Sequence, residues 1–536
     1  MVTADEAASD GWENWLQALA AARRATLLSS PGHANWRVWV AAEKLPLWHA
    51  IHADAAMQPA IEAPAEFLAQ AWSREDALLE MVRGRLVGLG PVTVATLAAS
   101  LAVDDGEVET ALLRLQSEGY VMQGLFTPAA SATQWCERHL LARIHRYTIG
   151  RLRREIEPVS RRDFMRFQFD WHHLAPGSRL SGPDALPAAI AQLEGYEAAA
   201  GAWEAELLPA RIDDYSITWL DDLCRAGRVG WNRLRGATGG SSPVRATPIV
   251  LLPRKEMALW SGIAGSAQPQ ELLLSSRAQA VADVLREHGA LFFDELMSAA
   301  HLLRTELEDA LGELVAAGRV TADSFAGLRA LLLPAAKRDA HRHRRMRRHL
   351  LSGIEDAGRW SLVRAPLAPD SKDSKRAEAV EHVARTLLRR YGVVFWKLLE
   401  REAGWLPTWR ELLRVYHRLE ARGEIRGGRF VEGLVGEQFA LPEAIGKLRQ
   451  IRQQPPENQY VCLSGCDPLN LVGTVLSGNR LPAVIGTRVL YEDGVAVAAL
   501  VANKPQWLAE ADSAAQQRWK SALLRRAEHD AASVHF

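Results

Sequence analysis

The 536-residue sequence has little cysteine and no long apolar run. Its four cysteines, Cys136, Cys224, Cys462 and Cys466, are too few and too scattered for a disulfide framework. No apolar stretch reaches the roughly 18 residues of a membrane span, and the N-terminus has no signal-peptide core. We therefore expect a cytoplasmic protein with no membrane partner.

An excess of charge of one sign is also missing, since 64 Lys and Arg balance 64 Asp and Glu. This excludes a uniformly basic nucleic-acid binder and leaves local basic clusters to consider. The phosphate-binding Gly-x-x-x-x-Gly-Lys-[Ser/Thr] motif does not occur; the Gly-rich 236–240 stretch has no lysine. The chain therefore carries no P-loop ATPase motor. Cys462 and Cys466 have no second thiol pair, so we expect core or surface cysteines, no metal and no cofactor.

A short pattern of Leu, Gly and Val or Ile recurs at a domain-sized period of about 90 to 110 residues. Each copy ends an amphipathic stretch, and its Gly stands where a helix end needs a left-handed residue before a strand. A winged helix leaves its third helix and enters its wing in this way. The copies are Leu115–Val121, Leu223–Val229, Leu314–Val320 and Leu419–Ile425. We predict four winged-helix modules.

The predicted fold is mainly α-helical with small β-sheets: tandem winged helices followed by a small β-barrel module. Capping-box patterns at Thr305–Glu308 and Thr408–Glu411 mark two of the third helices. In chain order we predict a mixed N-terminal segment (1–75), winged helices (76–135 and 136–240), a strand and loop connector (241–275), a winged helix (276–336), a basic linker (337–373), a winged helix (374–450) and the barrel module with a C-terminal helix (451–536).

The fourth module offers the best-defined basic surface. On a helix that starts at Thr408, Arg410, Arg414 and His417 fall within about 60° of one another, opposite the apolar positions. Arg426 and Arg429 follow in the predicted wing. This arrangement is typical of a recognition helix that contacts the nucleic-acid backbone. A merely solubilising face is the alternative.

Two other basic features are less well defined. The run 337–349 would attract phosphates or form a solvated linker helix; its arginines are Arg342, Arg344, Arg345, Arg347 and Arg348. Trp231 and Arg233 place an aromatic ring beside a cation in the second wing, where they would either stack on bases or form a core tryptophan with a charged rim. By contrast, the third helix of the third module is acidic, and we predict that it is structural or faces protein.

Several segments of the chain resemble the C-terminal region of the large helicase-related (Lhr) family, over nearly the whole length. They are Gln134–Thr148, Ile156–Phe167, His173–Gly177, Leu207–Arg211, Ala421–Phe430 and Asp467–Gly473. The resemblance implies an array of winged helices with a β-barrel module, similar to AlkZ-type DNA glycosylases. It also implies DNA as a partner, single-stranded or damaged, a helicase motor in cis or in trans, homo-oligomers, and removal of uracil from DNA.

AlkZ-like enzymes position a water molecule with a Gln-x-Gln or Gln-x-Asp pair, and Gln168-Phe-Asp170 resembles this motif. The two side chains would be the catalytic candidates. On one continuous helix, however, they point about 200° apart. They converge only if the helix breaks near Trp171–His173, and otherwise Gln168 is a polar residue at the edge of the core.

We therefore predict a DNA-binding C-terminal region of an Lhr-type DNA repair helicase, without its ATPase motor, that removes uracil as a glycosylase. The alternative is a non-enzymatic scaffold for oligomerisation and protein docking.

Overall fold

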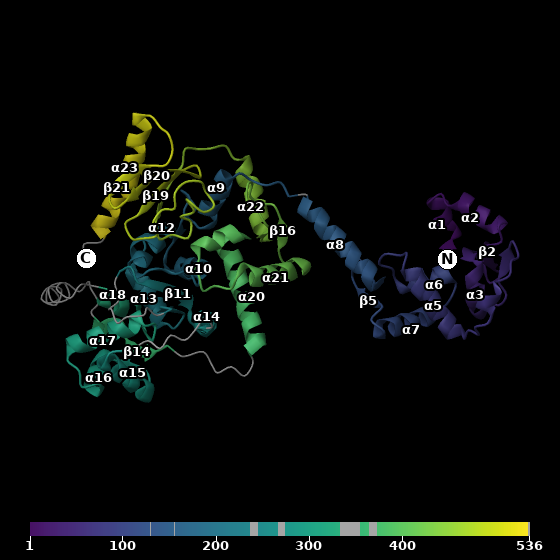
Figure 1. The fold of residues 1–536 in the computed structure, drawn as a ribbon, viewed down its shortest axis with the longest axis horizontal. Coiled ribbons are helices and arrows are strands. Elements are labelled where there is room, and N and C mark those ends of the chain that lie inside the picture. The colour runs from purple at the N-terminus through teal and green to yellow at the C-terminus, as the bar shows by residue number, and fades with distance from the viewer. Residues whose placement is uncertain are drawn as a thin grey trace. The chain divides into compact units, whose positions relative to one another are not determined.

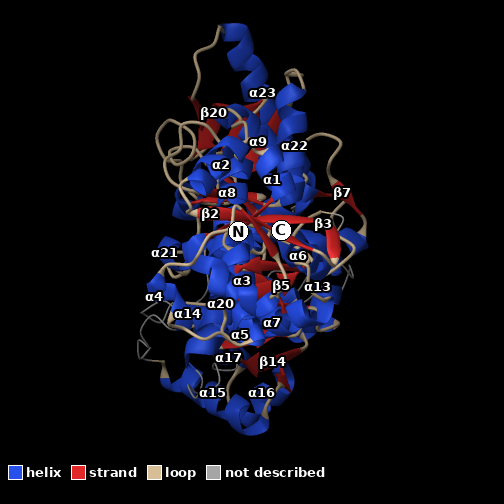
Figure 2. Cartoon of the chain, turned by 90° about the vertical axis from the view of Figure 1, so that its right-hand side faces the viewer, coloured by secondary structure: helices blue, strands red, loops and turns tan. Residues whose placement is uncertain are grey.

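The computed structural model describes residues 1–128, 130–154, 156–235, 245–265, 274–332, 354–363 and 372–533. The chain divides into two compact units, Met1–Arg151 and Leu152–Phe536, each considered by itself below. Helices predominate and the strands are short, as Figure 2 shows. No helix of the described ranges is long and apolar enough to cross a membrane.

The first unit begins with a small antiparallel sheet in the order β1-β3-β2-β4. Its strands are β1 (Val2–Thr3), β2 (Ala25–Ser30), β3 (His33–Ala41) and β4 (Ala56–Gln58), accompanied by helices α1 (Ala4–Ser9), α2 (Glu13–Ala21), α3 (Leu45–Ile51) and α4 (Ala65–Leu68). The first winged helix follows, with α5 (Arg74–Leu86), α6 (Val94–Leu101), α7 (Asp105–Ser117) and a hairpin of β5 (Val121–Gly124) and β6 (Gln134–Glu137). Helix α8 (Arg138–Arg154) then crosses the boundary between the units.

The second module opens the second unit. Its helices are α9 (Arg161–Trp171), α10 (Leu186–Gln192), α11 (Ala200–Ala202), α12 (Leu208–Arg211), α13 (Ile217–Arg225) and α14 (Met257–Gly265), with a π-helical turn at Trp203–Leu207. The wing pairs β10 (Val229–Asn232) with β11 (Pro248–Pro253), and β11 also pairs with β8 (Ala198–Ala199). A parallel pair, β7 (Leu180–Ser181) with β9 (Ile212–Asp213), lies in the same module.

The third module contains α15 (Ser276–His288), α16 (Phe293–Ala299), α17 (Arg304–Ala316) and α18 (Phe325–Leu331). Its sheet has the order β12-β14-β13, built from β12 (Leu291–Phe292), β13 (Val320–Ala322) and β14 (Arg359–Leu362). Strand β14 lies in the segment predicted to be a linker, and β11 of the second module lies in the segment predicted to be a connector. Wing strands pair across long loops, so sequence proximity does not delimit them.

The fourth module contains α20 (Lys372–Tyr391), a short 3-10 helix (Trp396–Arg401), α21 (Trp409–Ala421) and α22 (Pro442–Gln453). Its sheet has the order β15-β17-β16, from β15 (Val393–Phe395), β16 (Arg426–Gly428) and β17 (Gln438–Ala440). An antiparallel sheet β18-β19-β20-β21 follows, from β18 (Tyr460–Ser464), β19 (Arg488–Glu492), β20 (Val495–Val501) and β21 (Lys504–Trp507), with α23 (Ser513–Ser533) packed on it. The barrel predicted for this module stays a prediction.

The repeated glycines confirm the tandem pattern. One glycine stands two residues after the last residue of each of α7, α13, α17 and α21, the helices that we call the third helices of the modules. These glycines have φ angles of 71° (Gly119), 69° (Gly227), 68° (Gly318) and 76° (Gly423). A side chain at such a φ is strained, whereas glycine adopts it freely and lets the chain turn from helix to wing.

Figure 1 traces the elements of the second unit, and two shared hydrophobic cores connect its modules. Phe164 of α9 lies in one core with Phe395 of the fourth module and Tyr491 of the C-terminal sheet. Trp231 of the second wing lies in another core with Leu311 and Trp360 of the third module. The second module therefore packs against the third module, the fourth module and the C-terminal sheet, so the modules of this unit share their hydrophobic cores.

Candidate nucleic-acid interface

The start of helix α21 and the face that it buries both follow from its own sequence. At its start, the Thr408 hydroxyl accepts from the Glu411 N–H at 3.4 Å, and the Glu411 carboxylate accepts from the Thr408 N–H at 2.9 Å. Its apolar face is buried, with Leu412, Val415, Tyr416 and Leu419 at most 2% exposed. The predicted basic face therefore points outward: Arg410, Arg414 and His417 are all exposed.

The α21 arginines differ from those on the other third helices. Arg114 of α7 pairs with Asp76 at 3.2 Å, Arg225 of α13 with Asp222 at 3.3 Å, and Arg304 of α17 with Glu308 at 3.1 Å. Neither Arg410 nor Arg414 has an acidic partner within the described part of the chain. Their charges are therefore available to a phosphate without first breaking an ion pair.

His417 is less available than predicted. Its Nε2 lies 3.1 Å from a carboxylate oxygen of Glu437, at the base of the wing. The ring is exposed but already hydrogen-bonded, so it fixes the wing beside α21 rather than offering a free donor.

The wing itself is rigidly built. The loop 429–437 closes on the amide of Gln438, which is fully buried. Its oxygen accepts from the N–H groups of Phe430 and Val431 at 2.9 and 2.8 Å, and its nitrogen donates to the Val431 carbonyl at 3.0 Å. The predicted wing residues stand on this frame: Arg429 is exposed and Arg426 half-buried, neither with an acidic partner among the residues described.

A segment from before α9 docks on the wing. Val159 forms a parallel bridge with Val431, and its N–H donates to the Phe430 carbonyl at 2.8 Å. Below the wing, the buried Glu420 carboxylate accepts from Arg153 Nε at 2.7 Å and from the Gly427 N–H at 3.0 Å. The Glu420 hydrogen bond raises the pKa of Arg153. Sequence reasoning missed the contacts of Val159 and Arg153 with this module because the partners are more than 250 residues apart.

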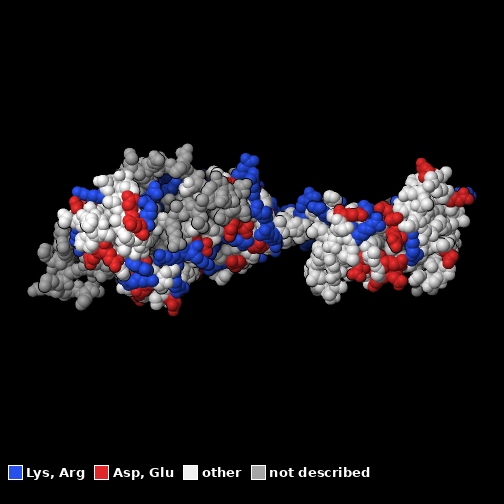
Figure 3. Space-filling model, turned by 90° about the horizontal axis from the view of Figure 1, so that it is seen from below, with Lys and Arg blue, Asp and Glu red and all other residues white. Residues whose placement is uncertain are grey.

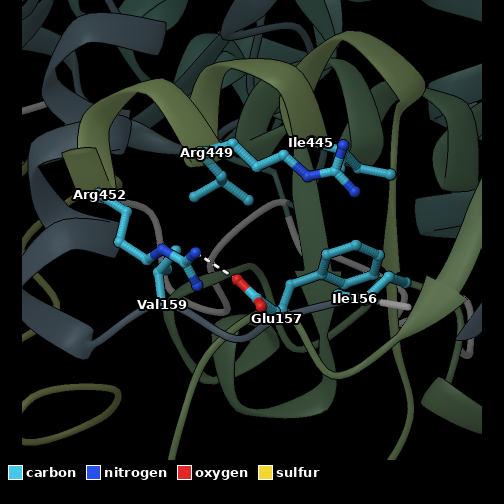
Figure 4. A pocket seen from close by; sticks show the side chains of 8 residues that line it. Ile156, Glu157, Val159, Ile445, Arg449 and Arg452 are labelled. Atoms are coloured by element: carbon cyan, nitrogen blue, oxygen red, sulfur yellow. Dashed lines mark hydrogen bonds and ion pairs between the residues drawn. The ribbon is translucent and has the colours of Figure 1, made fainter. Parts of the chain in front are cut away.

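A small hollow lies between this segment, the wing and α22 (Figure 4). Ile156, Val159, Phe430, Ile445 and Leu448 form its apolar lining, and Glu157, Arg449 and Arg452 complete it. Arg452 pairs with Glu157, and its hydrogen bond, with a smaller contribution from the charge of Arg449, lowers the pKa of the Glu157 carboxyl. Because the hollow holds little more than a water molecule, it is no pocket for a base. Arg449 still adds a cation beside the wing that no sequence signal marked.

The predicted catalytic pair does not converge. Helix α9 is continuous through both residues. Gln168 is fully buried and its nitrogen donates to the Tyr391 carbonyl at 2.7 Å, whereas the Asp170 carboxylate pairs with Lys447 of α22 at 2.8 Å. The two side chains serve different contacts, so they do not position one water molecule. The alternative, a polar residue at the core, describes Gln168.

The predicted stacking role of Trp231 is also wrong. Its ring is fully buried and its indole N–H donates to the Ser324 carbonyl of the third module at 2.9 Å. Trp231 is therefore the core tryptophan of the alternative interpretation. Arg233 is half-buried, and burial lowers its pKa, against the opposing charge of Glu197. Its binding role stays a prediction.

The remaining candidates lie outside the described residues: Arg342, Arg344, Arg345, Arg347 and Arg348. Basic and acidic side chains are interspersed over the face drawn in Figure 3. The described residues contain no group of His, Cys, Asp and Glu that could hold a metal ion. The described candidates are thus basic residues of the fourth module: Arg410 and Arg414 on α21, Arg426 and Arg429 in the wing, and Arg449 on α22.

Comparison with known proteins agrees with this architecture. Residues 159–254 and 373–460 match the third and fourth winged-helix domains of the large helicase-related protein. The chain is 29% identical over 494 residues to the "Lhr helicase/ probable uracil glycosylase" of Mycolicibacterium smegmatis, covering 88% of this chain and 31% of that protein. It is 29% identical over 433 residues to the "Lhr helicase/uracil glycosylase" of Escherichia coli K12, covering 74% of this chain and 27% of that protein.

The chain thus spans about a third of the length of these curated relatives or less. Two matched domains, similarity along most of the chain, and the repeated helix–glycine–strand units agree with one another. Over most of its length the chain is therefore similar to the C-terminal region of Lhr proteins, and two of its winged helices match winged-helix domains of that family.

Proposed function

We propose that this region binds DNA through its fourth winged helix and serves a repair helicase of the Lhr type. The observation that carries the proposal is the pair of exposed arginines on α21 that have no acidic partner in the described chain. Each such arginine neutralises a phosphate and releases a condensed counterion, at no cost in broken ion pairs. Arg426, Arg429 and Arg449 are further cations of the same module.

The proposal includes single-stranded or damaged DNA as the ligand, a helicase motor acting in cis or in trans, and homo-oligomers. The names of the relatives support the helicase context.

Removal of uracil belongs to the proposal through the relatives, whose names include uracil glycosylase. A glycosylase needs a carboxylate near the sugar of an extruded nucleotide. Asp170 is held by Lys447, and Gln168 is in the core. The catalytic carboxylate of such an activity is therefore not assigned to this pair.

The scaffold alternative drew on the acidic third helix of the third module. Glu306 pairs with Arg277 at 2.9 Å, and a Glu313 oxygen accepts from the Ser275 N–H at 2.7 Å. These two acids bind residues of their own module, which agrees with the structural role and not with the protein-facing role that we predicted for this helix. They leave less acidic surface for a partner protein, and DNA binding is the better-supported function.

The binding test removes two arginines of α21, and a control variant loses the same charge at two other positions. Arg410→Ala with Arg414→Ala should weaken binding of a fluorescent single-stranded oligonucleotide and reduce the slope of log affinity against log salt by about 1.4 to 1.8, for two phosphate contacts. The control, Arg114→Ala with Arg225→Ala, removes the same charge from paired arginines and should change neither. Fluorescence anisotropy from 50 to 200 mM salt measures both.

Unchanged affinity and slope in the α21 variant would contradict the assignment of this surface. Negligible affinity of the unaltered protein, with oligomers seen by light scattering, would favour the scaffold.

The excision test incubates the protein with uracil-containing and undamaged oligonucleotides and cleaves abasic sites with alkali. We expect cleavage in the uracil lane only, retained in Asp170→Asn because this carboxylate faces Lys447. Loss of cleavage in a folded Asp170→Asn protein would show that Asp170 is needed for excision, which would contradict our expectation that another carboxylate serves it. No cleavage in the unaltered protein would leave a binding region without glycosylase activity.

A further inference from the structure

An exposed tryptophan lies at the wing of the fourth module. Trp396 is 43% exposed, whereas Trp203, Trp231, Trp260 and Trp360 of the same unit are at most 1% exposed. It follows β15 directly and begins the short 3-10 helix. The exposed part of its indole is a flat apolar surface that a ligand can reach.

The ring is held in place by the wing. The indole N–H donates to the Val435 carbonyl at 3.1 Å, and a side chain at Gly436 would come within 3.5 Å of the ring. Val435 itself is 84% exposed. Trp396 and Val435 therefore form one apolar patch, joined through the wing backbone.

This patch stands on a preorganised loop. Besides the three hydrogen bonds to the Gln438 amide, the Arg161 guanidinium donates to the Gly433 carbonyl at 2.7 Å, and Val159 bridges to Val431. A loop that is already ordered loses little conformational entropy when a ligand binds.

One cation lies beside the patch. The Lys397 ammonium is 5.0 Å from the centre of the Trp396 ring and 2.7 Å from Glu400. The loop of Val435 carries Arg429 and two acids, Glu432 and Glu437. An exposed aromatic surface beside a cation complements a nucleotide, which joins a flat aromatic base to an anionic phosphate.

We propose that Trp396 and Val435 form a stacking platform for an unpaired nucleobase, in the same module as the arginines proposed to hold the phosphates. The inference rests on the proposed DNA binding and specifies its ligand: a strand with unpaired bases rather than a fully paired duplex. Every base presents a π-face, so the platform selects unpaired bases without selecting sequence.

The experiment compares a blunt duplex with the same duplex carrying a single-stranded extension labelled with 2-aminopurine. Trp396→Ala should lower affinity for the extended duplex about fivefold or more and abolish the change in 2-aminopurine fluorescence on binding. Affinity for the blunt duplex should stay within about twofold. Trp396→Phe, which keeps a ring, should restore much of the loss.

Two further variants keep the test independent of folding. Val435→Ser changes a side chain that is 84% exposed, so it should fold normally and weaken binding in the same selective way. Trp507→Ala removes a ring that is 38% exposed on β21, away from this wing, and should change neither affinity.

Equal loss for both substrates, or no loss for either, would overturn the platform. A protein that binds neither substrate would instead refute the proposed DNA binding. Sensitivity to Arg410→Ala with Arg414→Ala but not to Trp396→Ala would keep the binding surface and reject the platform alone.

Discussion

At the residue scale, Gly427 shows how one position couples the wing to the segment before α9. A Cβ at this residue would lie 2.5 Å from a Glu420 oxygen and 2.9 Å from Arg153 Nε. Moving either atom away would break hydrogen bonds, because the buried Glu420 carboxylate accepts from both the Arg153 guanidinium and the Gly427 N–H. The wing therefore requires glycine here, since its backbone lies against the Glu420 carboxylate and the Arg153 guanidinium that pairs with it.

We expect Gly427→Ala to lower the free energy of unfolding of the fourth module by about 1 to 3 kcal/mol, the usual cost of overpacking a well-packed site. Gly446→Ala is the matched control: this glycine lies in α22 with nothing near its Cβ position, and the change should stabilise by about 0.5 to 1 kcal/mol. Denaturant unfolding monitored by hydrogen exchange in 390–452 measures both. Equal stability of the two variants would contradict the close contact.

At the element scale, the four third helices share a fold and differ in the state of their arginines. Helices α7, α13 and α17 pair each of the arginines compared above with an acid of the same module. Helix α21 does the same on its other side, where Arg418 lies 3.9 Å from Glu381, and leaves Arg410 and Arg414 open. The reduced salt dependence of DNA affinity that we predict for Arg410→Ala with Arg414→Ala is a property of helix α21. It depends on which arginines of one helix face lack an acidic partner, and not on the total charge of the chain, which is balanced.

At the scale of the whole second unit, a buried polar junction joins the second module to the segment between β18 and β19 of the last sheet. The Arg211 guanidinium donates to Asp467 at 2.8 and 3.2 Å, and both residues are at most 1% exposed. The same guanidinium lies 3.2 Å from His172 Nδ1. Arginine only donates, so this histidine nitrogen accepts and the ring is neutral.

Burial, followed by the charges of Arg211 and Arg390, lowers the pKa of His172 well below its usual 6.5. In the range between the lowered pKa and 6.5 the unfolded chain therefore binds the extra proton. His172 contributes stability above about pH 6.5 and loses it as the pH falls, by up to about 1.4 kcal/mol per pH unit. Breaking this junction by acid should loosen the packing between α12 and the 466–471 segment.

We expect the protection of these two segments against hydrogen exchange, corrected for intrinsic rate, to fall between pH 7 and 5.5. His172→Asn should flatten that fall. His288→Asn, at the exposed end of α15, serves as the control and should leave the fall unchanged. A pH dependence identical in all three proteins would show that His172 is not the titrating group.

The sequence alone determined what depends on neighbouring residues. Helix ends follow from capping residues and left-handed glycines, so the tandem modules and the exposed face of α21 could be predicted from Thr408, Gly423 and the spacing of apolar positions. The helical geometry of α9 already set Gln168 and Asp170 on different sides.

The tertiary structure alone decided what depends on distant partners. Trp231 became a core residue because the third module covers it, β14 came from a predicted linker, and the rim of the wing was assembled from Arg153, Val159 and Arg449. Local sequence sets backbone conformation through short-range sterics and hydrogen bonds. The burial of Trp231 and the pairing of Arg153 with Glu420 arise only when segments far apart in the chain pack together, and no spacing along the chain records which segments those are.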